Sequence, residues 1–296
     1  MAKAFQLIGS ALLYYLVLIP ISLLPFSILH FISRVLYVIL YHVIGYRRAV
    51  VMTNIRNSFP EKSDGECAEI AKRFYKHLCD VILESQKLFT IPTRQLEKHI
   101  HCVNPEVVNH YANQGKSVII AVGHCNSWEL MLTVSNTLFK QRAVVIYKPL
   151  RNKFLDQKMI RARSKAGTRM LSVNEVKTFF NTLSGELFAT VFAIDQSPPV
   201  PAKSYWMNFL NQDTAVLFGA ELYAKTFNQP VLYSRLLKIK RGYYQVEFVN
   251  VIDDPMNTSY GEITEKVTRL LEQDIIAHPE SWLWSHRRWK HKRPQA

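Results

Sequence analysis

Two ionisable side chains, His124 and Glu129, stand just after an apolar run, VIIAV, at residues 118–122. A histidine titrates near neutral pH and can remove a proton from a hydroxyl when a carboxylate fixes its tautomer and stabilises the imidazolium. Five-residue spacing would place the two side chains about 140° apart on one continuous helix. The pair can therefore meet only if His124 lies in a loop and Glu129 in the first turn of a helix.

The surrounding residues favour that arrangement. Gly123 permits a sharp exit from a strand, and Asn126 or Ser127 is a suitable N-cap for a helix that holds Glu129. Ligands of α/β proteins bind at the carboxyl ends of strands, where His124 would lie. The pattern predicts half of an acyl-transfer site without an enzyme nucleophile. An ordinary capping box, in which Asn126 and Glu129 cap the helix and His124 is a loop residue, fits the spacing equally well.

Cys125 offers a second chemistry, a thiolate nucleophile with His124 as its base. Adjacent side chains rarely point at each other, so a small apolar role for this cysteine is favoured. The four cysteines, at positions 67, 79, 102 and 125, show no metal-ligand spacing and no disulfide pattern. We expect no metal site and a reducing compartment.

The elements that must position these residues alternate between strand and helix. Apolar spacing predicts a long helix over 63–89. Later in the chain we expect strands at 117–122, 143–147 and 188–194, and two strand-like runs within 230–252. Between and after them we expect helices near 128–139, 152–166, 174–183, 214–227 and 259–277. Such alternation predicts an α/β fold with a mostly parallel central sheet flanked by helices. The last two strands, joined at Arg241-Gly242, are expected to form a hairpin at the sheet edge.

The first 46 residues predict a membrane-anchoring hydrophobic helix. Residues 4–33 contain no Asp, Glu, Lys or Arg. Pro20 and Pro25 leave both a straight crossing and a monotopic insertion open, and a buried core helix of a soluble protein is the other alternative. Positive charge is heavier after the segment than before it, which places the main domain in the cytoplasm. We expect an anchor over 1–46 and one catalytic domain over 47–296.

The charge of the chain predicts an anionic partner. Its formal net charge is +14, and its hydrophobic content of 48% excludes a disordered protein. The basic carboxyl-terminal segment also contains Trp282, Trp284 and Trp289. Nucleic-acid binding, a tryptophan and arginine belt at a bilayer, and a frayed solvated end all fit this segment, and the apolar N-terminus favours the bilayer.

Several blocks together give the chain a family resemblance. GHCNSWE at 123–129 contains the H-x4-[DE] signature of the glycerolipid acyltransferase superfamily, and the chain resembles the branch of bacterial lipid A biosynthesis acyltransferases. The other blocks, in the same order as in that family, are NIRNSFPE (54–61), YKPLRN (147–152) with RSKAG (163–167), AIDQSPP (193–199) and PESWLWSHRRWK (279–290). The resemblance covers most of the chain.

What the resemblance implies is an inner-membrane enzyme that moves an acyl chain from a thioester to a lipid hydroxyl. His124 would be the general base and Glu129 its partner, with Arg163, Asp195 and Gln196 binding substrate. The donor would be acyl-acyl carrier protein or acyl-coenzyme A, without a further cofactor, and the acceptor a lipid A precursor or a lysophospholipid. Without the resemblance, Asp195 and Gln196 fit a turn and Arg163 a solvated helix face. A non-catalytic, basic protein of the membrane surface is the alternative from another class.

Overall fold

The computed structural model describes residues 2–182 and 185–294. Its centre is a seven-stranded sheet with the strand order β1-β9-β8-β2-β5-β3-β4. Every neighbouring pair is parallel except β8 and β9, so the predicted α/β fold with a mostly parallel sheet is confirmed. The strands are β1 (Ile100–Cys102), β2 (Val118–Val122), β3 (Arg142–Tyr147), β4 (Arg169–Ser172), β5 (Phe188–Ala193), β8 (Val231–Lys240) and β9 (Tyr243–Ile252).

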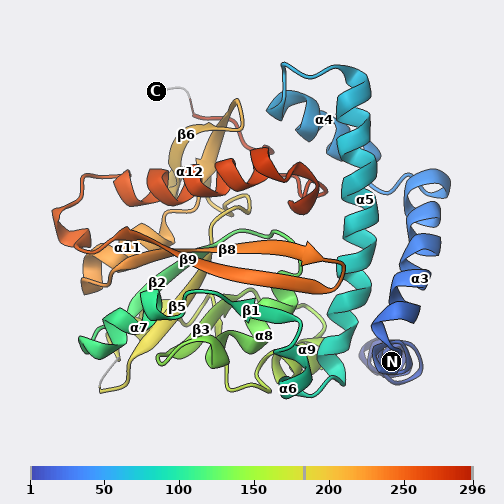
Figure 1. Ribbon diagram of the computed structural model, residues 1–296, viewed down its shortest axis with the longest axis horizontal. Coiled ribbons are helices and arrows are strands. Elements are labelled where there is room, and N and C mark those ends of the chain that lie inside the picture. The colour runs from blue at the N-terminus through green and yellow to red at the C-terminus, as the bar shows by residue number, and fades with distance from the viewer. Residues whose placement is uncertain (1, 183–184, 295–296) are drawn as a thin grey trace.

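Helices cover both faces of this sheet (Figure 1). Side chains alternate along β2, so that Ile119 packs with Val267 of α12 in one core, whereas Ile120 packs with Leu130 of α8 in the other. The helices of the main domain are α4 (Arg48–Ser58), α5 (Asp64–Gln86), α6 (Thr93–Leu96), α7 (Glu106–Asn113), α8 (Trp128–Leu138), α9 (Lys153–Arg163), α10 (Val176–Asn181), α11 (Gly219–Phe227) and α12 (Glu262–Ala277), with short 3-10 turns η3 (Lys87–Phe89), η4 (Pro201–Lys203), η5 (Pro255–Asn257) and η6 (Pro279–Ser281).

Two sequence-based expectations are wrong at the margins of the sheet. The β8–β9 hairpin is not at the edge, because β1 pairs in parallel with the outer side of β9. A three-residue strand is too short to show a periodic pattern. The helix expected over 214–227 begins only at Gly219, because β7 (Gln212–Val216) precedes it and pairs with β6 (Tyr205–Phe209) in a separate antiparallel hairpin.

The N-terminal segment is not one straight helix. It consists of α1 (Ala2–Leu12), a π-helical turn η1 (Leu13–Leu18) and α2 (Ile19–Leu23), followed after Pro25 by α3 (Phe26–Tyr37) and a second π-helical turn η2 (Val38–Val43). Two stretches, Phe5–Leu23 and Phe26–Val43, are long and apolar enough to cross a membrane. In Figure 1 the first is seen end-on near the N-terminus, whereas α3 runs beside α5. Pro25 is the N-cap of α3, so the chain changes direction there.

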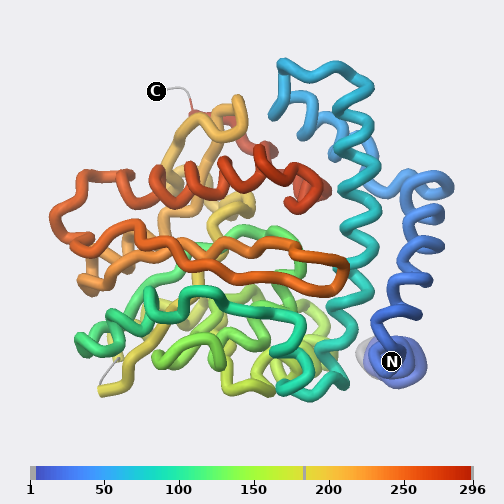
Figure 2. Tube along the Cα trace, in the orientation of Figure 1, coloured from blue at the N-terminus to red at the C-terminus, as the bar shows by residue number. Residues whose placement is uncertain are grey.

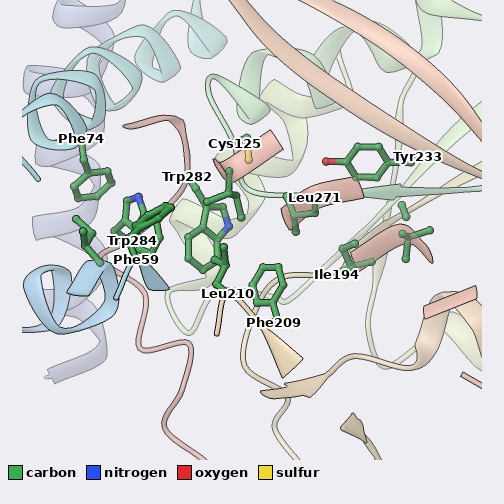
Figure 3. Packing of buried hydrophobic residues seen from close by; sticks show 14 of the residues in the cluster. Phe59, Phe74, Cys125, Ile194, Phe209, Leu210, Tyr233, Leu271, Trp282 and Trp284 are labelled. Carbon is green, nitrogen blue, oxygen red and sulfur yellow. The ribbon is translucent and has the colours of Figure 1, made fainter. Parts of the chain in front are cut away.

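The carboxyl-terminal segment belongs to the core. Trp282 and Trp284 are buried, and Figure 3 shows them packed among Phe59, Leu210 and Cys125. The indole of Trp284 lies 5.8 Å from the ring of Phe59 and 4.8 Å from that of Trp282. The expectation that this segment forms an aromatic belt at the membrane surface is therefore wrong for these two tryptophans. These tryptophans are buried by residues far away in the sequence, such as Phe59, so the composition of their own segment could not predict the burial.

Candidate active site

Adjacent strand ends bring the two central residues together. β2 and β5 are parallel neighbours, in register from Val118 opposite Ala189 to Val122 opposite Ala193. His124 follows the end of β2 by two residues, and Asp195 follows the end of β5 by two. Parallel strands end at the same edge of a sheet, so the side chains after them meet. Nδ1 of His124 lies 2.6 Å from Oδ1 of Asp195, and the backbone N–H of His124 donates to Oδ2 at 2.7 Å.

This contact fixes the state of the imidazole. A carboxylate can only accept a hydrogen bond, so Nδ1 carries the proton and the lone pair of the neutral ring lies on Nε2. Burial by itself lowers the pKa of His124, but the charge and hydrogen bond of Asp195 outweigh it, with a smaller contribution from Glu129, so the pKa is raised. Burial raises the pKa of Asp195, but His124 overcomes this effect and holds that pKa below its ordinary value.

Glu129 has a different partner from the one predicted. α8 begins at Trp128, so Glu129 does lie in the first helical turn, and His124 does lie in the loop. Both carboxylate oxygens of Glu129, however, accept hydrogen bonds from Arg163 at the end of α9, from Nε at 2.8 Å and from Nη2 at 2.6 Å. The carboxylate that hydrogen-bonds to His124 belongs to Asp195. The catalytic and binding roles assigned to these residues remain predictions.

The turn after β2 contradicts the capping-box alternative. Asn126 has a left-handed backbone, with φ of 53°, and its side-chain amide donates to the carbonyl of Leu236 at 2.6 Å. The N-cap of α8 is Ser127, whose side chain makes no capping hydrogen bond, so Asn126 and Glu129 do not form a capping box. Gly123 does not have a left-handed backbone, but a Cβ at this position would lie 2.5 Å from Cδ1 of Leu271, so that side chain would have to move. Helix α12 packs directly against the turn that presents His124.

Cys125 is not placed as a nucleophile. Its backbone bridges to that of Trp282, and its side chain is buried in the aromatic core shown in Figure 3. Burial raises the pKa of its thiol well above the ordinary value, and nearby Asp195 adds to the effect. A thiol held protonated is a poor nucleophile.

Two further residues hold the site, and only one of them was predicted. The amide Nε2 of Gln196 lies 3.1 Å from Nε2 of His124, where it donates to the lone pair. The indole N–H of Trp282 donates to Oδ2 of Asp195 at 2.7 Å, a contact that sequence analysis missed. The only sequence signal was the joint presence of the AIDQSPP and PESWLWSHRRWK blocks.

His124 lines a cavity of about 850 Å³. Side chains from the sheet, from α8, α9 and α11, and from the N-terminal helices line it, and most of them are apolar. Its polar lining includes His124, Glu129, Arg163 and Gln196, together with Lys148 and Lys158. Leu18, from η1, forms part of the wall. The volume lies within the roughly 300–1,000 Å³ of small-molecule sites, and the lining suits a long apolar group with a polar reacting end.

Within residues 2–182 and 185–294, no group of three or more His, Cys, Asp or Glu side chains is arranged to hold a metal ion.

Comparisons with known proteins show the family of this chain. The chain is 21% identical over 270 residues to lipid A biosynthesis palmitoleoyltransferase of Escherichia coli (strain K12). The aligned residues cover 90% of this chain and 86% of that protein. The same identity and coverage hold for lipid A biosynthesis acyltransferase of Shigella flexneri. The sequence profile of the bacterial lipid A biosynthesis acyltransferases matches residues 3–291, so the chain belongs to that family and is an acyltransferase.

Proposed function

We propose that this protein is a membrane-associated O-acyltransferase that moves a fatty acyl chain from a thioester to a hydroxyl of a lipid A precursor, with His124 as the general base. One observation carries the proposal. Nδ1 of His124 is bonded to a buried carboxylate, and His124 lines a largely apolar cavity. Acyl transfer needs this combination, a base at the end of a site that accepts a hydrocarbon chain.

The reaction proceeds by direct attack. The acceptor hydroxyl displaces the amide of Gln196 from Nε2 of His124 and gives its proton to that nitrogen. Its oxygen bonds to the thioester carbonyl carbon to form a tetrahedral intermediate. The carbon–sulfur bond then breaks, and the thiolate takes the proton from the imidazolium. Asp195 stabilises the imidazolium throughout, since it accepts from Nδ1.

Glu129 and Arg163 act as a unit beside the base. The bidentate pair fixes the guanidinium, which lines the cavity and has further N–H groups beyond the two that Glu129 receives. These donors stabilise the oxyanion of the intermediate or a phosphate of the acceptor. Glu129 thus acts on His124 through its negative charge and through the position of Arg163. Asp195 acts on His124 by a direct hydrogen bond.

Acyl-acyl carrier protein is the proposed donor. Acyl carrier proteins are small and acidic, so a chain with a net charge of +14 should attract one over an extended surface. The advantage of acyl-acyl carrier protein over acyl-coenzyme A in kcat/KM should shrink as salt rises, because such attraction is screened over about 10 Å at 0.1 M ionic strength. Equal use of both donors at every salt concentration would assign the positive charge to the membrane or to the acceptor instead.

The proposed location is the cytoplasmic face of the inner membrane, with residues 1–46 as the anchor and residues 47–296 as the acyltransferase domain. Support comes from the two apolar N-terminal stretches and from Leu18, which contributes to the cavity wall. The acceptor and its acyl chains would then be drawn from the bilayer that the anchor contacts.

The test is acyl transfer by purified His124→Ala, followed by mass spectrometry of the lipid product. Loss of a general base should lower turnover by roughly 10² to 10⁴ without unfolding the protein. His101→Ala is the matched control, because His101 is an exposed residue of β1 outside the cavity. Near-normal turnover of a folded His124→Ala variant would refute the mechanism. A product formed only from lysophospholipid would move the acceptor to that class.

A further inference from the structure

The N-terminal helices carry a polar face that is tied to the main domain. Nε2 of His30 lies 2.9 Å from Oε1 of Glu84, whose side chain is fully buried. The hydroxyl of Ser33 donates to Oδ1 of Asp80 at 2.6 Å. Arg241, at the turn of the β8–β9 hairpin, donates to Asp80, to the hydroxyl of Ser33 and to the carbonyl of His30. One face of α3 is therefore bonded to α5 and to the sheet.

The bend at Pro25 is tied down in the same way. Nζ of Lys87 donates to the carbonyls of Ser22 and Leu24, at 2.8 and 2.9 Å, and Thr90 donates to that of Ser22 at 2.7 Å. Earlier in the segment, Lys158 donates to the hydroxyl of Tyr15 at 2.9 Å. Carbonyls freed by a bend in a helix need such partners in an apolar surrounding. The main domain supplies them here, from η3 and its flank.

These contacts conflict with a membrane-spanning α3. The stretch Phe26–Val43 has 18 residues, about 27 Å of helix, which is close to the roughly 30 Å of a hydrocarbon core. α5 runs alongside it (Figures 1 and 2) and would occupy the same depth. α5 carries charged side chains along its whole length, from Asp64 to Glu84. Charged residues at the centre of a bilayer are rare and costly, so α3 and α5 cannot both lie there as a pair.

The opposite face of the segment is apolar and exposed. We define the N-terminal apolar surface by Phe5, Leu12, Leu16, Leu23, Phe31 and Val43, all of which are exposed. Beside this surface, basic side chains of the main domain lie over aromatic rings of the N-terminal segment: Lys158 lies 5.1 Å from the ring of Tyr15, and Lys76 lies 5.6 Å from that of Tyr37. Aromatic and cationic side chains together are typical of the boundary between lipid chains and anionic head groups.

We propose that α1–α3 dip into a single leaflet of an anionic bilayer and do not cross it, so that the N-terminal apolar surface contacts acyl chains and the basic side chains contact head groups. This inference rests on the membrane association proposed above and specifies its geometry. Interfacial helices bury their apolar face about 5–10 Å into the boundary between head groups and chains. The cavity wall at Leu18 then lies at the depth of the head groups, where lipid hydroxyls are found.

Depth measurements along α3 test the proposal. Single cysteines replace Ile28, Val35 or Val43, each exposed, in a Cys102→Ser background, because the other three cysteines are buried. Each carries a nitrobenzoxadiazole label, and the full chain is bound to vesicles of phosphatidylethanolamine and phosphatidylglycerol with nitroxides at shallow or deep acyl positions. We expect the shallow nitroxide to quench all three labels more strongly. Strong quenching of position 35 by the deep nitroxide, with shallow quenching of positions 28 and 43, would establish a crossing and overturn the proposal.

A charge substitution gives a second readout that does not depend on activity. Phe31 is 65% exposed on the N-terminal apolar surface, and Ile276 is 58% exposed on α12. Phe31→Lys should lower partitioning into the vesicles about tenfold or more, whereas Ile276→Lys should leave it unchanged. Equal partitioning of both variants would overturn the proposal. Failed acyl transfer with an unchanged depth profile would count against the proposed function alone, since neither readout measures turnover.

Discussion

Asp195→Asn is the sharpest perturbation of the proposed base. Oδ2 of Asp195 accepts two N–H donors, from the His124 backbone and the Trp282 indole, whereas Oδ1 faces Nδ1 of the imidazole. An asparagine keeps both N–H donors satisfied only if its oxygen takes the position of Oδ2. Its NH₂ group then faces Nδ1 and must donate to it. The proton of the ring moves to Nε2, where it blocks the lone pair that the acceptor hydroxyl needs.

The expected loss of turnover follows from two changes, the loss of the carboxylate charge and the shift of the ring proton to Nε2. A hydrogen bond to a charged group is worth about 1.5–3 kcal/mol, and each 1.36 kcal/mol of barrier is a factor of ten in rate. Loss of the carboxylate behind the imidazolium should therefore cost about 10- to 10²-fold. The wrong tautomer adds to this, up to the roughly 10⁴-fold reported for a comparable carboxylate-to-amide change behind a catalytic histidine. We expect kcat to fall by about 10² to 10⁴ with little change in folding.

The pH dependence separates this effect from a general loss of structure. A base works when neutral, so the activity of the unchanged enzyme falls as pH drops through the pKa of His124, which is raised mainly by Asp195 against the effect of burial. Removal of that charge lowers the pKa, so the acid limb of the residual kcat/KM should move to lower pH. Glu129→Gln removes a smaller contribution to the same pKa and should move the limb less.

The assay is transfer from acyl-acyl carrier protein to a lipid A precursor in detergent, measured across pH for both variants. Thermal unfolding of each variant provides the check on folding. An Asp195→Asn variant with normal turnover and an unchanged acid limb would refute the assigned partner. A larger shift for Glu129→Gln than for Asp195→Asn would identify Glu129 as the residue that tunes the base.

Three further predictions concern the surroundings of the base. Cys125→Ser should retain most of its activity, since the thiol is buried and protonated, and an acyl group trapped on Cys125 in mass spectra would contradict direct attack. Gly123→Ala should lower the free energy of unfolding by about 1–3 kcal/mol in chemical denaturation, because its Cβ would meet Leu271. An unchanged free energy of unfolding would argue against this clash. Trp282→Phe keeps an aromatic ring but removes the N–H donor to Asp195, so it should lower turnover. It should also lower the free energy of unfolding in chemical denaturation by about 1–3 kcal/mol. Unchanged turnover and unfolding free energy would show this hydrogen bond to be unimportant.

Local patterns were sufficient for the strands and helices that place the base. β2 and β5 are short apolar runs, and α8 and α12 are long periodic segments, so each has a signal within its own residues. The positions of His124 and Asp195 at strand ends followed from these runs. β1 and the β6–β7 hairpin carry no comparable signal, because three to five residues of mixed polarity give no clear period.

The pairing of side chains could not be predicted in this way. Whether His124 meets Glu129 or Asp195 depends on β2 and β5 being neighbours, which is a property of strand order rather than of spacing along the chain. Trp282 reaches Asp195 across 87 residues because the carboxyl-terminal segment packs against the turn after β2, which spacing along the chain also does not reveal. The family resemblance marked the residues, but it did not state which of them are in contact.

The position of Leu18 predicts how the acceptor reaches the enzyme, because Leu18 lines the cavity and belongs to the helical segment that we propose to contact lipid. With α1–α3 in a leaflet, the acceptor reaches His124 by lateral diffusion and never passes through water. The concentration that saturates the enzyme is then the mole fraction of acceptor in the surface, not its amount per litre. Addition of inert lipid or detergent at constant bulk acceptor should slow turnover by surface dilution, and the Michaelis constant should be expressed in two dimensions.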